Sequence, residues 1–275
     1  MNRQNPCRVA CIGSGGVATS LLQALYHAGY SITQVYSRHL KNAAALAHKV
    51  EAEAIDNLQH YRDDADVVIV ALPDDTIESV LPCFAAGKAL IVHTCGSLAM
   101  QVFEHQGIAH YGVLYPLQTL SRQRVVDMRD VPIFVEANTP ANTIFLQSLA
   151  GYISKNVSEM SSEKRLQLHL AAVFACNFTN HLWSIATDIL QNNKLSPALL
   201  RPLISETLAK ATAAKHPQEV QTGPAYRGDK KIMQKHIKLL NNNELQQKIY
   251  ALLSDSIQRS AINFAKFRFF ATFAV

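Results

Sequence analysis

The chain has 275 residues, 48% of them hydrophobic and 17% charged, which is typical of a folded protein of about two domains and excludes a disordered or collagen-like chain. Its 26 Lys and Arg exceed its 21 Asp and Glu and give a net charge of +5, but the basic residues are scattered and form no nucleic-acid-binding motif. This balance favours small anionic ligands over nucleic acid.

Short β-rich runs alternate with helical patterns from Arg8 to about Tyr152, which indicates a parallel sheet with crossover helices. Strands are expected at residues 8–12, 32–36, 52–55, 67–71, 89–93, 109–113 and 133–136. Helices are expected from the glycine-rich turn to about Ala28, at residues 42–50, and after residue 73, where Asp74 or Asp75 can cap the helix. After Lys155 the pattern is helical with no convincing strand. We therefore expect an α/β domain with a parallel, doubly wound sheet at residues 1–157, and an all-α domain at residues 158–275.

A glycine-rich turn follows the first expected strand. Residues 13–18 read G-x-G-x-x-A and lie between a strand and a helix, which is the context of the phosphate-binding turn of a Rossmann dinucleotide-binding domain. The expected cofactor-binding residues here are Gly13, Ser14, Gly15, Gly16 and Val17.

The end of the second strand sets the choice of cofactor. Ser37 and Arg38 stand where NAD enzymes place an acid on the ribose, and no Asp or Glu occurs between Gly15 and Glu51. A hydroxyl and a guanidinium can bind a 2′-phosphate, so we expect NADP(H) rather than NAD(H). The alternative is that Arg38 is only a solvated loop charge.

Loops at the carboxyl ends of the later strands should line the ligand. We expect Leu72, Pro73, Asp74, Cys95 and Gly96 at the cofactor, and Ser97 and Gln118 at the substrate. The alternative is ordinary turn chemistry, because Pro and Gly are common in loops.

The most informative segment is a long helix expected at residues 162–192. At ~100° per residue, one side carries His169, Asn177, Asn180, His181, Ser184 and Asp188, and the other side is apolar. Residues 166–187 contain no Lys, Glu, Arg or Asp, whereas a solvated helix face usually does, so we interpret the polar side as lining a site. A solvated face is the alternative. This stretch is long enough to span a bilayer, but its polar residues make insertion costly, so we expect a buried helix and no membrane contact.

Residues 221–230 combine turn formers with Arg227, Asp229 and Lys230. An arginine here can face a substrate carboxylate, and a plain surface loop is an equally good interpretation.

Cysteines and termini bear on location and assembly. The five cysteines are widely spaced without a C-x-x-C pair, which predicts free thiols in a reducing compartment and no metal site. Residues 1–8 are polar and lack the apolar stretch of a secretory signal, so we expect a cytoplasmic protein.

Five of the eleven phenylalanines, Phe264, Phe267, Phe269, Phe270 and Phe273, fall in the last twelve residues and would form a large apolar patch on a monomer. We interpret this cluster as part of a contact surface between two copies of the chain, and a terminal helix packed on its own subunit is the alternative.

Four motifs together resemble one known family. They are Ile12-Gly-Ser-Gly-Gly-Val17, Tyr115-Pro-Leu-Gln-Thr119, His169-Leu-Ala-Ala-Val-Phe174 with Asn177-Phe-Thr-Asn-His181, and Gly223-Pro-Ala-Tyr-Arg-Gly-Asp229. The chain is similar to oxidoreductases that pair a Rossmann-like domain with a helical domain of unknown function. They belong to the superfamily of 6-phosphogluconate dehydrogenase, pyrroline-5-carboxylate reductase and ketopantoate reductase. The resemblance implies NADPH-dependent reduction of a carbonyl or an imine, a cleft between the domains, and a homodimer joined through the helical domains.

The resemblance also implies a proton donor on the long helix. Ketopantoate reductases and hydroxyacid dehydrogenases use a lysine there, but this chain has none between Lys164 and Lys194. Histidine can donate a proton near neutral pH, so His169 is the expected donor and Lys230 the second choice. Asn177 or Asn180 would bind the substrate, which is anionic, with a 2-keto acid such as ketopantoate as the candidate. Because the lysine is missing, a non-catalytic NADPH-sensing protein is the alternative.

Overall fold

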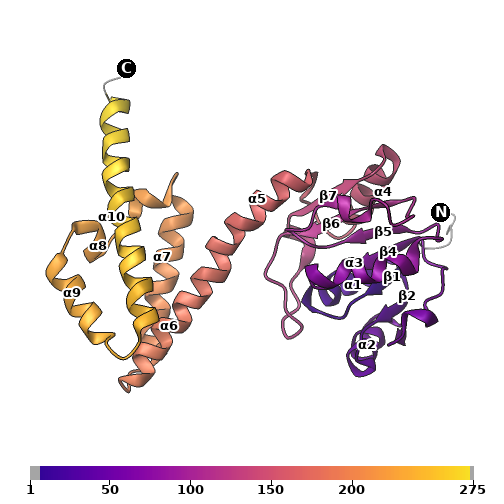
Figure 1. Ribbon diagram of the computed structural model, residues 1–275, viewed down its shortest axis with the longest axis horizontal. Helices are drawn as coiled ribbons and strands as arrows, with labels where there is room; N and C mark the ends of the chain where they lie inside the picture. Colours follow the sequence, from indigo (N-terminus) through magenta and orange to yellow (C-terminus); the bar gives the residue numbers. More distant parts are fainter. Residues whose placement is uncertain (1–6, 273–275) are drawn as a thin grey trace. The chain divides into compact units, whose positions relative to one another are not determined.

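The computed structural model describes residues 7–272, with side chains to Phe264. The chain divides into two compact units, Met1–Phe178 and Thr179–Val275 (Figure 1). Among the described residues, no helix is long and apolar enough to span a membrane.

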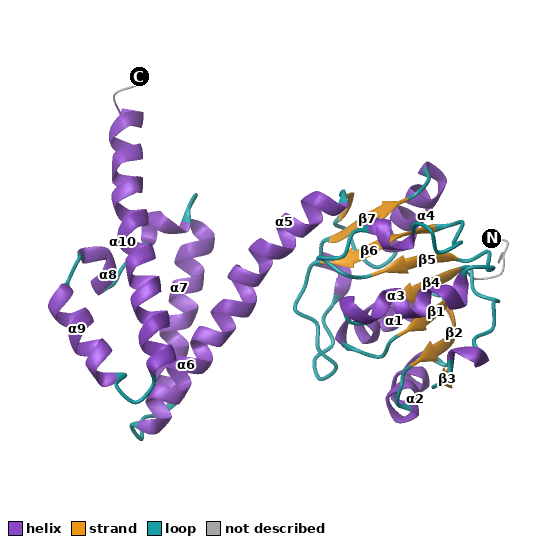
Figure 2. Ribbon diagram, in the orientation of Figure 1, coloured by secondary structure: helices purple, strands orange, loops and turns teal. Residues whose placement is uncertain are grey.

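The first unit is built on one sheet, drawn in orange in Figure 2. Its strands are β1 (Arg8–Ile12), β2 (Ser31–Tyr36), β3 (Glu53–Ile55), β4 (Val67–Val70), β5 (Leu90–His93), β6 (Tyr111–Pro116), β7 (Ile133–Ala137) and β8 (Val157–Glu159). Its α-helices are α1 (Gly16–His27), α2 (Leu40–Ala47), α3 (Asp74–Val80), α4 (Pro140–Gly151) and α5 (Ser162–Ala172). Short 3₁₀ helices occupy His48–Val50, Leu58–His60, Leu81–Phe84, Met100–Phe103 and Met128–Asp130.

The strand order is β3-β2-β1-β4-β5-β6-β7-β8. All pairs from β3 to β6 are parallel, which confirms the predicted doubly wound α/β class. The order reverses between β1 and β4, and open α/β sheets bind ligands at the carboxyl ends of the strands at such a point. The sheet is mostly parallel, as predicted, and its antiparallel pair is formed by β6 and β7 near one edge.

Each face of the sheet has its own hydrophobic core. Alternate residues of β1, β4 and β5 contribute to the two cores, as expected for strands that are covered on both sides. Helices α1, α2 and α4 pack on one face, and α3 with Phe84 and Phe103 packs on the other. These layers fix the strand ends, so the loops that follow β1, β4, β5 and β6 start from rigid positions.

Two local predictions are corrected by the structure. The residues after Lys155 do contain a strand, β8, which pairs in parallel with β7. Neither Asp74 nor Asp75 is the N-cap of α3, because Pro73 holds that position and both acids lie inside the first turn. The acids still favour this helix, since negative charge stabilises a helix N-terminus.

A helical stretch begins at Ser162 and runs to Asn192, as the sequence predicted, but it is not α-helical throughout. Helix α5 is followed by a π-helical segment, Val173–Phe178, and then by α6 (Thr179–Asn192) of the second unit. The expectation of a buried helix is wrong for the single chain, because none of residues 166–187 is buried.

The second unit is all-helical. After α6 it contains α7 (Arg201–Ala213), α8 (Pro224–Arg227), α9 (Lys230–Leu239) and α10 (Glu244–Thr272), with 3₁₀ helices at Pro197–Leu200 and Pro217–Val220. Helix α10 packs against α8 and α9. Among residues 179–264, whose side chains the structure describes, Ala225 alone is buried.

Candidate active site

The turn between β1 and α1 has a shape that requires glycine. Gly13 has a φ of 131°, and a Cβ there would lie 2.2 Å from the carbonyl oxygen of Ala71, just after β4. Gly15 is the N-cap of α1 and has open space where a side chain would be. No side chain caps α1 and its first turn holds no acidic residue, so its free N–H groups are available to an anion.

A hydroxyl and a cation lie beside this turn. The Gly13 N–H donates to the carbonyl oxygen of Tyr36 over 2.9 Å, which places the residues that follow β2 next to the glycines. Those residues are Ser37, which is half-buried, and Arg38, which is exposed. A phosphate bound there would receive charge-assisted hydrogen bonds.

A cavity of about 1000 Å³ lies at the carboxyl ends of β1, β4, β5 and β6, and α5 with the π-helical segment forms one wall. It brings together many of the predicted site residues, namely Gly15, Gly16, Val17, Leu72, Pro73, Asp74, Cys95, Gly96, Gln118, His169 and Asn177. Other predicted residues lie outside this lining: Gly13, Ser14, Ser37, Arg38 and Ser97. The lining also includes residues that were not predicted individually, Thr94, Tyr115, Leu120 and Ser121 among them.

In this cavity His169 from α5 meets Tyr115 from β6. The Tyr115 hydroxyl lies 3.3 Å from Nδ1 of His169, and the two rings pack edge to face. Gly96 leaves room for the pair, because a Cβ there would lie 2.5 Å from His169 Nδ1 and 2.9 Å from Tyr115 Cζ. Burial raises the pKa of Tyr115, so the phenol keeps its proton at neutral pH. The contact engages Nδ1 of His169 and leaves Nε2 for a ligand.

Asp74 supplies a negative charge to the same cavity. Partial burial alone would raise the pKa of its carboxyl, but hydrogen bonding with Cys95 and Ser97 and the nearby imidazoles of His169 and His93 outweigh that effect and lower the pKa. The carboxylate therefore stays ionised at neutral pH. The Ser97 hydroxyl donates to it, so this predicted substrate residue is held by Asp74.

His93, at the end of β5, is buried behind the cavity. Its Nδ1 accepts a hydrogen bond from the Cys95 N–H over 3.2 Å, and its ring stacks on Phe103. Burial, assisted by the positive charge of Arg165, lowers the pKa of His93 to about 3. This histidine is neutral near pH 7 and has a structural role.

A buried ion pair fixes the start of α5. Arg165 is 1% exposed, and its guanidinium donates to Glu136 of β7 over 2.7 Å, to the Leu98 carbonyl over 2.7 Å and to the Ser162 hydroxyl over 3.0 Å. Ser162 also donates to Glu136 and accepts from the Met100 N–H. Because His169 follows one helical turn after Arg165, this clamp sets where the imidazole stands.

The remaining predicted site residues belong to the second unit. Asn180 lies in α6, Arg227 ends α8, and Lys230 begins α9. The Asp229 carboxylate caps α9 by accepting from the Ile232 N–H over 3.2 Å, so it has a structural role there. A site role for these four residues stays a prediction.

A doubly wound sheet, an anion-binding glycine turn and a cavity at the strand ends define a dinucleotide-dependent enzyme. Comparison with known families makes this specific. Residues 8–95 match the family described as NADP oxidoreductase, coenzyme F420-dependent, and residues 131–257 match a domain of unknown function, DUF2520. The crystal structure of a "putative NADP oxidoreductase" from Bacteroides fragilis is 41% identical, with a TM-score of 0.89, over 92% of this chain and 98% of that chain. The protein belongs to this family of NADP-dependent oxidoreductases, which confirms the resemblance seen in its motifs.

More distant structures share the fold. An imine reductase from Myxococcus stipitatus in complex with NADP⁺ has a TM-score of 0.60 at 15% identity, over 94% of each chain. A pyrroline-5-carboxylate reductase from Coxiella burnetii has a TM-score of 0.56 at 18% identity, over 95% of this chain and 98% of that one. No curated protein matches the sequence.

The cofactor is NADP(H), as predicted, and the residues present fit it. The open N-terminus of α1 suits a pyrophosphate, and the residues after β2 include a cation and no acid.

Proposed function

We propose that the protein uses NADPH to reduce a small carbonyl compound and that His169 donates the proton. The observation that carries this proposal is the placement of His169. It lines the same cavity as the glycine turn and is held through Nδ1 by Tyr115. When bound, NADPH supplies the hydride.

The residues of the chain perform the rest of the reaction. Nε2 of His169 gives a proton to the oxygen that becomes an alkoxide, and Tyr115 holds the imidazole in position throughout. Asn177 lines the cavity and can bind the substrate by hydrogen bonds, together with Gln118. We assign Arg38 and Ser37 to the 2′-phosphate. Lys230 stays the second choice of donor, with Asn180, Arg227 and Asp229 as further substrate contacts.

The substrate class is a small anion, with a 2-keto acid such as ketopantoate as the candidate. A cyclic imine is the competing substrate, because the distant relatives include an imine reductase and a pyrroline-5-carboxylate reductase. Both substrates need a hydride and a proton, so the same histidine serves either reaction.

We further propose that the working form is a cytoplasmic homodimer. Large apolar side chains are exposed along the helices of the second unit, including Trp183, Leu203, Leu208, Leu239 and Leu252. A unit with so little buried surface needs a partner to cover it, and a second copy supplies the same apolar face. Phe264 stacks on His216, with 6.0 Å between ring centroids, and the other four phenylalanine side chains of the C-terminal cluster lie outside the described residues.

A substrate panel tests the proposed reaction. NADPH oxidation would be followed with 2-keto acids, including ketopantoate, and with cyclic imines, for the wild type, His169→Ala and the surface control His48→Ala. We expect His169→Ala to lose ~10² to 10⁴ in turnover because it removes a general acid. NADPH binding should be retained in both variants. Intact turnover in His169→Ala would contradict the assignment, and Lys230 would be replaced next.

A further inference from the structure

The loop after β6 crosses the glycine turn. Its Leu120 carbonyl oxygen would lie 2.4 Å, and Ser121 Cα 2.8 Å, from a Cβ at Gly16. The G-x-G-x-x-A pattern needs glycine at positions 13 and 15 but places no demand on position 16. Gly16 is therefore explained by the close approach of this loop.

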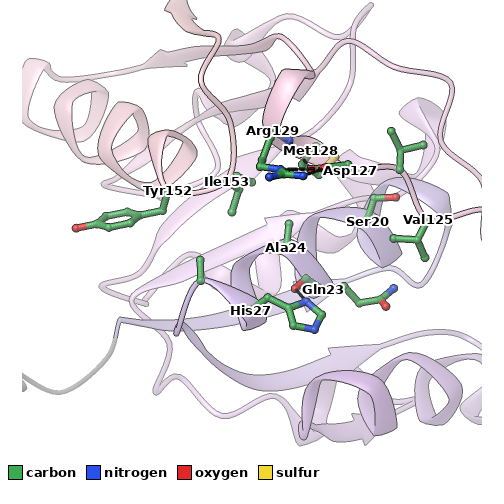
Figure 3. A pocket seen from close by; sticks show the side chains of 12 residues that line it. Ser20, Gln23, Ala24, His27, Val125, Asp127, Met128, Arg129, Tyr152 and Ile153 are labelled. Atoms are coloured by element: carbon green, nitrogen blue, oxygen red, sulfur yellow. Dashed lines mark hydrogen bonds and ion pairs between the residues drawn. The ribbon is translucent and has the colours of Figure 1, made fainter.

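We call residues 117–126 the strap, and its two ends are anchored. Leu120 and Val126 pack against the hydrophobic core on the α1 face of the sheet. Beyond the strap, Met128 is buried, and Asp127 caps the 3₁₀ helix by accepting from the Arg129 N–H. A cavity of about 360 Å³ lies between α1 and the residues around the end of the strap. Figure 3 shows Val125 and Asp127 on one side of this cavity and Gln23 of α1 on the other. Residues 121–125, between the anchors, are exposed.

Arg122 lies in this exposed part, and its guanidinium points toward the glycine turn. Its Nη2 donates to the Ser14 hydroxyl over 3.5 Å, and Ser14 is 6% exposed. Among the side chains that the structure describes, no carboxylate pairs with Arg122. An unpaired guanidinium and the positive end of α1 thus share one place, which is unfavourable unless an anion lies between them.

We propose that Arg122 is a cofactor-binding residue that contacts the pyrophosphate of NADP(H), and that the strap seated on Gly16 positions it. The inference rests on NADP(H) binding and does not require the proposed proton donor. The pyrophosphate lies at the N-terminus of the first helix in this fold, where Ser14 and Gly15 stand. Arginine suits this task, because its planar fork can donate two hydrogen bonds to phosphate oxygens.

The chemistry of the two cofactors separates Arg122 from Arg38. NADPH and NADH have the same pyrophosphate and differ in the 2′-phosphate. Loss of Arg122 must therefore raise the Kd values of both cofactors by the same factor, whereas loss of Arg38 should raise the Kd for NADPH alone.

The test is a fluorescence titration of the full-length chain with NADPH and with NADH, without substrate. We expect Arg122→Ala to raise both Kd values about 10- to 100-fold, the range for a lost charge-assisted hydrogen bond, with an unchanged NADPH to NADH ratio. Arg122→Lys should recover part of the affinity. Arg124→Ala is the matched control, since Arg124 is an exposed arginine of the same strap, and its Kd values should stay within about twofold of the wild type.

Gly16→Ala tests the seating of the strap independently. A methyl group there collides with strap backbone, so both cofactors should bind more weakly, as in Arg122→Ala. Unchanged Kd values in Arg122→Ala would overturn the proposal. A loss confined to NADPH would also overturn it, because the contact would then be to the 2′-phosphate.

Discussion

Removing one partner of the buried pair Arg165–Glu136 should destabilise the first unit by several kcal/mol. Replacing Arg165 by Met removes the three hydrogen bonds of the guanidinium and leaves the Glu136 carboxylate, 15% exposed, with the Ser162 hydroxyl. The Leu98 carbonyl loses its donor in the same step. Removing one partner of a buried ion pair costs ~3–5 kcal/mol, because an uncompensated charge remains inside the protein. We expect the free energy of unfolding to fall by this amount, and its total for a typical domain is ~5–15 kcal/mol.

The assay is urea unfolding followed by circular dichroism, with Arg259→Met as the matched control. Arg259 pairs with Asp255 on α10, but both side chains are more than half exposed, so its loss should cost below ~1 kcal/mol. The double variant Arg165→Met/Glu136→Leu should recover part of the loss, because no buried charge is then left alone. If Arg165→Met lowers the free energy of unfolding no more than Arg259→Met does, the Arg165–Glu136 pair does not hold α5 in place.

Three further predictions follow from the site and the helical unit. The pKa of His93 is about 3 in the folded chain against an ordinary 6.5, so between these pH values His93 is protonated in the unfolded chain and neutral in the folded chain. Stability should then fall by up to ~1.4 kcal/mol per pH unit as the pH drops from 6.5 towards 3. His93→Asn should flatten this slope in urea titrations at pH 7, 5.5 and 4.5, and an identical slope would exclude His93 as its source. Gly96→Ala should displace His169 and lower turnover by ~10² or more, with a smaller change in the Kd for NADPH, and equal losses would argue against steric displacement. Sedimentation should show a homodimer for the full chain, and a monomer at every concentration would refute the dimer. If a chain truncated after Ser260 stays dimeric, the C-terminal tail is not needed for the contact, but the dimer itself stands.

The parts of the fold that were predictable from sequence are those with strong local patterns. The continuous apolar run of β4 and the glycine turn after β1 identify the centre of the sheet and its ligand-binding edge. Strand β8 has one apolar residue, Val157, and exists because β7 offers it a pairing edge. Such a strand is set by tertiary pairing rather than by its own pattern.

The candidate site was predictable to the level of loops and one helix, but not of contacts. Tyr115 and His169 are 54 residues apart, and no local pattern reports that their side chains meet. The helical wheel also assumed 3.6 residues per turn, whereas residues 173–178 form a π-helix with i→i+5 hydrogen bonds. The predicted stripe is therefore shifted beyond Val173, and only His169 and Asn177 of that stripe line the cavity.

The five thiols differ in accessibility, so the rate at which individual cysteines are alkylated can be used to detect ligand binding. Burial raises the pKa of Cys11 to about 12 and that of Cys7 to about 11, and it also raises the pKa of Cys95, so these three form little reactive thiolate at neutral pH. Cys83 and Cys176 are exposed, and Cys176 lines the large cavity. A maleimide or iodoacetamide will therefore mark these two first. Occupancy of the cavity shields Cys176, while Cys83 provides an internal reference, so mass spectrometry of the labelled chain can rank ligands of unknown identity without following catalysis.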